Sequence, residues 1–169
     1  MWLVHLCTPL FRMLQRIQSI FLLAAAACSG ATWFFPVRTL VVDGSTVRLF
    51  TYGIEYDNGV EVDGIGLPLP YYILHSVVAA ALIVSVFLYG KRARQIRVVR
   101  GTWIMGMLIA VLQYMTCNSL GAYYADGAPA EGSYGISFFL PMATILFAIL
   151  AERAIKKDED LVKSADRLR

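Results

Sequence analysis

Four polar side chains lie within long apolar stretches of the chain, where they could take part in chemistry. They are His75, Gln113, Thr116 and Asn118. An imidazole inside a membrane can relay a proton or bind a ligand, and ionisable groups there are often functional. His75 has no Asp or Glu partner in any of these stretches. We therefore interpret the four as hydrogen-bonding groups between packed helices, with a small polar cavity between the second and third helices as the alternative.

The sequence lacks the motifs of common catalytic, cofactor and metal sites. Neither a Gly-x-Ser-x-Gly motif nor a glycine-rich phosphate-binding loop is present. The two histidines lie far apart, so no metal site can be assembled around them from strong ligands. Asp57, Glu61 and Asp63 form an acidic cluster, but their spacing lacks the calcium-loop pattern and favours a solvated edge. We therefore predict no enzyme, no cofactor and no metal site.

The composition is that of a membrane protein, because 58% of the 169 residues are hydrophobic and only 16% are charged. Soluble domains have about 25% charged residues. Four stretches without Asp, Glu, Lys or Arg hold roughly 20 residues each, enough for a helix to cross a hydrocarbon core of about 30 Å. They predict an all-α membrane fold, a bundle of four transmembrane helices at about residues 17–35, 69–90, 102–125 and 134–151.

The charged residues predict how this bundle is oriented. All 15 Lys and Arg and all 12 acids lie outside the four spans, which argues against an ion-coupled transporter. Residues 91–100 carry five cations and no acid, and cytoplasmic loops are enriched in Lys and Arg. We therefore expect this connector and both termini to face the cytoplasm, and residues 36–66 and 126–131 to face outward.

The first outer connection, residues 36–66, has the pattern of β-strands. The runs RTLVV and STVRLFTYGIEY are rich in β-branched and aromatic residues, and the turn sequences DGS and DNG follow them. We predict a small antiparallel sheet of two or three strands that caps the outer end of the bundle.

Residues 1–12 precede a second methionine, Met13, which would itself begin a well-formed span. We interpret these residues as an N-terminal extension that is either interfacial or not translated, and residues 13–169 as one membrane domain. A lipoprotein signal ending at Cys28 is the alternative for the first span. Ala25 stands where such signals usually have Leu or Val, so an uncleaved signal-anchor helix is favoured.

Beyond residue 151 the sequence changes to an amphipathic helix without a helix breaker. We predict that residues 152–169 form a cytoplasmic helical extension of the fourth span. Five acids and six cations in residues 151–169 nearly balance, which disfavours nucleic-acid binding. The apolar stripe on this tail predicts docking against residues 91–100 or against a protein partner. The candidate partner surface consists of Arg94, Arg97, Lys156, Lys157, Asp158, Glu159, Asp160 and Arg167.

Two segments resemble those of a known family. The opening QRIQ, residues 15–18, and the tail segments RAIKKDE, residues 153–159, and DRLR, residues 166–169, are similar to a family of four-helix inner-membrane proteins of unknown function, typical of Bacteroidetes-type bacteria. The resemblance covers residues 13–169. It implies a multi-pass protein of the bacterial inner membrane that begins at Met13, and it implies no activity.

The leading functional hypothesis is a non-enzymatic accessory or scaffold subunit that engages a partner protein, or a second copy of itself, through its cytoplasmic loop and tail. The alternative is a small transporter or lipid-binding protein that uses the polar cavity near His75 and Gln113.

Overall fold

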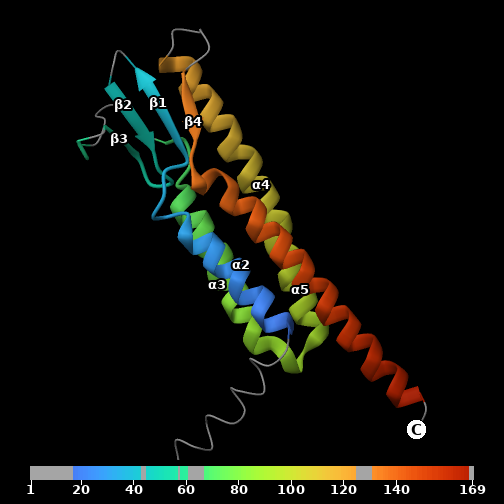
Figure 1. Cartoon of the computed structure of the whole chain (residues 1–169). Coiled ribbons are helices and arrows are strands. Elements are labelled where there is room, and N and C mark those ends of the chain that lie inside the picture. The colour runs from blue at the N-terminus through green and yellow to red at the C-terminus, as the bar shows by residue number, and fades with distance from the viewer. Residues whose placement is uncertain (1–16, 43–44, 57, 61–66, 125–130, 168–169) are drawn as a thin grey trace, which may run out of the picture.

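The computed structural model describes residues 17–42, 45–56, 58–60, 67–124 and 131–167. Its helices run side by side, and a small sheet lies at one end of them (Figure 1). The elements in chain order are α2 (Ile17–Ala31), β1 (Arg38–Val42), β2 (Ser45–Leu49), β3 (Ile54–Tyr56), α3 (Tyr71–Phe87), the 3-10 turn η1 (Leu88–Gly90), α4 (Arg92–Tyr124), β4 (Gly132–Tyr134) and α5 (Ile136–Arg167). We call the end with the strands the sheet end. The opposite end, with residues 88–100 and 152–160, is the charged end.

The predicted set of four helices is confirmed, and three of them have the length and apolar composition of membrane spans. These are the segments Tyr71–Gly90, Arg92–Tyr124 and Ile136–Asp160. Such helices indicate a membrane protein.

The first helix, α2, is shorter than the predicted span. It ends at Ala31, and its 15 described residues extend only about 22 Å at a rise of 1.5 Å per residue. The chain turns at residues 32–35 because Pro36 follows, and the residue before a proline disfavours helical geometry. Trp33 and Phe34 are exposed at this turn.

The core of the bundle consists of apolar side chains from all four helices. Leu22 on α2, Leu82 on α3 and Ile109 on α4 are each almost fully buried, together with Ala148 and Ala151 on α5. The small side chains Ala25 and Ala26 lie on the buried face of α2, which packs against both α3 and α5. Small residues at helix contacts let the backbones approach closely.

The sheet has one more strand than predicted. Its order is β3-β2-β1-β4, and its neighbouring strands are antiparallel. Strands were predicted in the connection between α2 and α3, which holds β1, β2 and β3, but the predicted run at residues 45–56 is split by a turn in which Phe50 N–H bonds to Gly53 O. The fourth strand, β4, lies in the connection between α4 and α5, and the sequence does not predict it because GSY has no strand pattern.

The acidic cluster Asp57, Glu61 and Asp63 lies outside the described residues. Residues 58–60 between these acids are described: Gly59 has a φ of +76°, a conformation that glycine adopts readily, and Tyr56 N–H bonds to Val60 O.

Arg38 joins the sheet to the bundle. Its Nη1 donates a 2.7 Å hydrogen bond to the backbone oxygen of Cys117 on α4, and its guanidinium carbon lies 5.1 Å from the centre of the Tyr134 ring. Gly121, one turn further along α4, leaves space for this side chain. The sheet is therefore held to α4 by a half-buried cation.

The prediction of a loop at residues 91–100 is wrong, because the residues from Arg92 onward form the first turns of α4. Gln95, Ile96 and Val99 are buried at helical spacing and give this segment an inward face. Gln95 Nε2 donates to the backbone oxygen of Ser85 near the end of α3. The predicted continuity of the fourth span with the tail is confirmed, since α5 runs unbroken from Ile136 to Arg167.

The close contact at Gly121 predicts that a single methyl group displaces the end of the Arg38 side chain. A Cβ there would lie 2.8 Å from Nη1 of Arg38, so Gly121→Ala should break the bond from Nη1 to the Cys117 oxygen and cost about 1 kcal/mol. A Cβ at Gly101 on the same helix has no atom within 4 Å, so Gly101→Ala should be neutral or stabilise by up to about 1 kcal/mol. Thermal unfolding in mild detergent compares the two. Equal midpoints would contradict the anchoring role of Arg38.

Candidate functional site

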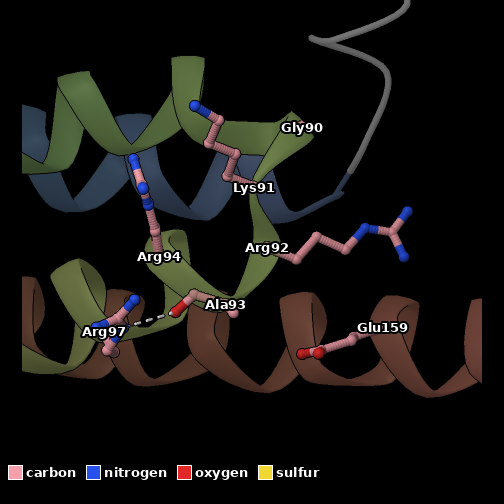
Figure 2. Close-up of a pocket in the computed structure, with 7 residues that line it drawn as sticks. All are labelled: Gly90, Lys91, Arg92, Ala93, Arg94, Arg97 and Glu159. Atoms are coloured by element: carbon pink, nitrogen blue, oxygen red, sulfur yellow. Dashed lines mark hydrogen bonds between the residues drawn. The ribbon is translucent and has the colours of Figure 1, made fainter.

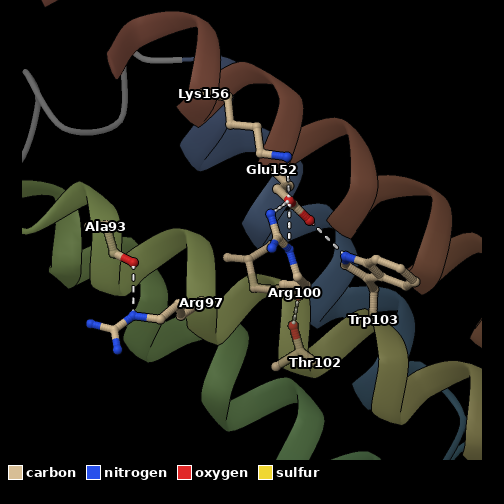
Figure 3. A network of polar contacts seen from close by, with 8 residues as sticks. Ala93, Arg97, Arg100, Thr102, Trp103, Glu152 and Lys156 are labelled. Atoms are coloured by element: carbon tan, nitrogen blue, oxygen red, sulfur yellow. Dashed lines mark hydrogen bonds and ion pairs between the residues drawn. The ribbon is translucent and has the colours of Figure 1, made fainter. Parts of the chain in front are cut away.

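Glu152 is the centre of a polar cluster at the charged end. Its side chain is buried, with 6% of the residue exposed, on the face of α5 that meets α4. Arg100 donates to its Oε1 from Nε at 3.1 Å and from Nη2 at 2.7 Å. Trp103 Nε1 donates to Oε2 at 2.8 Å, and Lys156 Nζ lies 2.8 Å from Oε1 (Figure 3). These four residues form the Glu152 cluster.

Helical spacing brings the cluster together. Arg100 and Trp103 are three residues apart on α4, and Glu152 and Lys156 are four apart on α5, so each pair lies on one face of its helix. The side chains of Arg100 and Lys156 are 47% and 49% exposed, while that of Glu152 is 8% exposed. The carboxylate therefore lies inside the helix contact, and both cations reach it from the surface.

The chemistry open to Glu152 is limited by these partners. A carboxylate has about four sites for hydrogen bonds, and the two oxygens here already accept from three side chains through four contacts. A general base or nucleophile needs a lone pair directed at a substrate. The geometry instead suits a clamp that fixes α5 against α4.

The first turns of the tail are docked on the bundle. Ile155, one of the predicted apolar stripe, is fully buried in the same core cluster as Ile96 and Val99 of α4. Arg92 Nη1 donates a 2.7 Å hydrogen bond to the backbone oxygen of Asp158. The intramolecular docking that the stripe predicted is therefore present over residues 152–158.

The cations that make this contact differ from the expected ones. Arg92 and Arg100 hold the tail, whereas Arg97 Nε donates to the Ala93 oxygen on its own helix and Arg94 is exposed. The helical form of residues 92–100 explains the position of Arg94, because at about 100° per residue it lies about 120° around the axis of α4 from Arg100.

The predicted partner surface lies together at the charged end, on the start of α4 and the second half of α5. Its exposed members are Arg94, Arg97, Lys156, Lys157 and Asp160, while Asp158 and Glu159 are half-buried. Arg167 is the last residue of α5, and its side chain lies outside the described part of the chain.

The predicted polar cavity is a set of hydrogen bonds with little space around them. His75 Nε2 on α3 lies 3.1 Å from Gln113 Oε1 on α4, and the Tyr71 hydroxyl lies 2.6 Å from Thr116 Oγ1. Asn118 is apart from them and accepts from the Tyr134 hydroxyl at the sheet end. The space lined by Gln113 and Thr116 measures about 10 Å³, roughly the volume that one water needs.

These contacts satisfy buried polar groups between helices. Gln113 Nε2 also reaches the Ser137 oxygen on α5 at 3.5 Å, and Ser29 on α2 donates to the His75 backbone oxygen at 2.9 Å. Buried polar atoms are costly unless they are hydrogen-bonded. No three His, Cys, Asp or Glu side chains of the described residues come together as metal ligands.

Glu152 was missed in the sequence because it is the first charged residue after the fourth apolar stretch. The sequence assigns it to the tail at residues 152–169, yet the structure buries it. The signal was a Glu four residues before a Lys, which pairs along one helix face, combined with Trp103 and Arg100 on a neighbouring helix.

The Glu152 cluster predicts a stability loss when its carboxylate is neutralised. Glu152→Gln removes the negative charge that faces Arg100 and Lys156 and should cost about 1–3 kcal/mol. Asp160→Asn makes the same charge change on the exposed part of α5 and should cost less than about 0.5 kcal/mol. Thermal unfolding of both purified variants in detergent measures the difference. The clamp is disproved if Glu152→Gln melts no lower than Asp160→Asn.

Comparison with known proteins agrees with the resemblance of the opening and tail segments. No curated protein matches the chain. A family model described as a domain of unknown function, DUF4293, matches residues 14–168, which include all the helices and strands described above. The chain belongs to this family, DUF4293.

Proposed function

We propose that this protein is a non-enzymatic accessory or scaffold protein of the bacterial inner membrane, and that it engages a protein partner through its charged end. The observation that carries the proposal is the course of α5. This helix leaves the bundle and continues past the ends of the other helices (Figure 1). A helix that projects from a membrane bundle has surface to offer a partner.

The projecting helix is fixed at its base. The Glu152 cluster and the buried Ile155 hold residues 152–155 against α4, and the Arg92 contact holds Asp158. A fixed helix loses little conformational freedom when it binds, which favours recognition. Beyond that base, α5 continues to Arg167, and its sequence keeps the apolar stripe at Leu161 and Val162.

The distribution of cations supports a cytoplasmic charged end. Residues 91–100 carry five Lys and Arg with no acid, and they lie at Lys91 and in the first turns of α4, directly after the apolar segment Tyr71–Gly90. Positive residues next to spans remain on the cytoplasmic side. The sheet end then faces outward, as do the exposed side chains of Trp33 and Phe34.

A scaffold role fits the polar groups better than transport does. The Glu152 oxygens are engaged by their neighbours, and His75 and Gln113 bond to each other. The space beside Gln113 and Thr116, about 10 Å³, is too small for a solute. The scaffold role is therefore favoured over the cavity-based alternative.

Site-specific photo-crosslinking tests the proposal in cells. A photoreactive amino acid replaces Lys157, which is exposed on α5, and separately Tyr52, which is exposed at the sheet end. We expect Lys157 to capture a defined cytoplasmic protein, or a second copy of the chain, that Tyr52 does not capture. The yield should fall to the Tyr52 level in a chain that ends at Asp160, because the stripe beyond it is removed.

Two results of this experiment would contradict the proposal. The first is capture of the same proteins from Lys157 and Tyr52. The second is an unchanged Lys157 product in the chain that ends at Asp160.

A further inference from the structure

An open groove of about 500 Å³ lies between the start of α4 and the tail of α5 (Figure 2). Its volume is within the range of known small-ligand sites. Its lining residues are Gly90, Lys91, Arg92, Ala93, Arg94, Arg97 and Glu159. Four Lys and Arg residues and one Glu thus line the groove, and the Glu152 cluster does not.

We propose that this groove binds the phosphate head group of an anionic membrane phospholipid. The inference goes beyond the proposed function, because it concerns a lipid at the start of α4 rather than a protein on the tail of α5. Charge complementarity is its first support. Four of the seven lining residues are Lys or Arg against one Glu, and basic pockets between membrane helices bind anionic head groups.

Two of the guanidinium groups are already oriented. Arg92 is held by its bond to the Asp158 oxygen, and Arg97 by its bond to the Ala93 oxygen. Each of these bonds uses one N–H, and a guanidinium has five. Side chains ordered in advance lose less entropy when they bind an anion. Arginine also contacts a phosphate through two parallel hydrogen bonds.

The position of the groove selects a lipid over a dissolved anion. The groove begins at Gly90, where the apolar segment Tyr71–Gly90 ends, so it lies at the level where head groups meet the end of a span. Phe87 and Tyr89, just before it in the chain, are 61% and 41% exposed. A phosphate in the groove would therefore have apolar surface beside it for the acyl chains.

The tail completes one wall of the groove through Glu159. This carboxylate lies on α5, opposite the cations of α4 (Figure 2). The Glu152 cluster lies about two turns earlier on α5 and holds that helix against α4. It thereby fixes the distance between the two walls of the groove. The groove is therefore a consequence of how the tail docks.

Native mass spectrometry of the purified full-length protein tests this site. The probes are dioleoyl-phosphatidylglycerol and dioleoyl-phosphatidylcholine, which share acyl chains and differ in charge. We expect phosphatidylglycerol to bind more tightly than phosphatidylcholine, by about tenfold or more, because each cation near an anionic lipid contributes to attraction. Equal binding of the two lipids by the unaltered protein would overturn the proposal.

Matched variants locate the effect. Arg94→Gln with Arg97→Gln should abolish the preference, whereas Arg153→Gln with Lys157→Gln should retain it. Both pairs remove two exposed cations, but the second pair does not line the groove. Arg94→Lys with Arg97→Lys keeps the charge and should retain most of the preference. Equal loss in the two Gln pairs, or complete loss in the Lys pair, would overturn the site.

A soluble competitor separates a lipid from a free phosphate. Glycerol phosphate added at the concentration of the lipid should not displace phosphatidylglycerol, because it lacks the acyl chains. Displacement at that concentration would assign the groove to a dissolved phosphate and overturn the lipid proposal. The experiment uses no protein partner, so its result is independent of the crosslinking result.

Discussion

The structure depends on the need to pair one buried carboxylate, that of Glu152. An ionised carboxylate without partners in a helix contact costs several kcal/mol. Arg100 and Trp103 satisfy it only because α4 begins at Arg92, before the apolar stretch that would span a membrane. The docking of the tail and the groove beside it both follow from this pairing.

Arg38 has a comparable role at the other end of α4. A half-buried guanidinium from the sheet bonds the backbone of Cys117 and lies over the ring of Tyr134. Both ends of α4 are therefore joined by a charged side chain to a segment distant in sequence, while Leu82, Ile109 and other apolar side chains fill the middle. In a membrane, contacts of this kind specify which helices meet, because apolar faces alone do not distinguish a neighbour from lipid.

The sequence predicted those features that depend on local pattern. The apolar stretches predicted the four helices, the β-branched runs predicted β1 and β2, and the absence of a helix breaker beyond residue 151 predicted that α5 continues into the tail. It failed where the structure depends on distant partners. Gly132–Tyr134 is a strand only because β1 pairs with it, and Glu152 is buried only because α4 brings Arg100 to it. For the same reason, the sequence predicted the polar side chains around His75, but it did not predict that the space beside them is only about 10 Å³.

The central claim is that the Glu152 cluster fixes the direction in which α5 leaves the bundle. Pulsed electron spin resonance on labels at Val77, exposed on α3, and Asp160, exposed on α5, measures this in lipid bilayers after the native cysteines are replaced. We predict one narrow distance distribution in the protein with Glu152 and a broad one in Glu152→Gln. A distribution that is broad with Glu152 in place, or one that Glu152→Gln leaves unchanged, would contradict the claim.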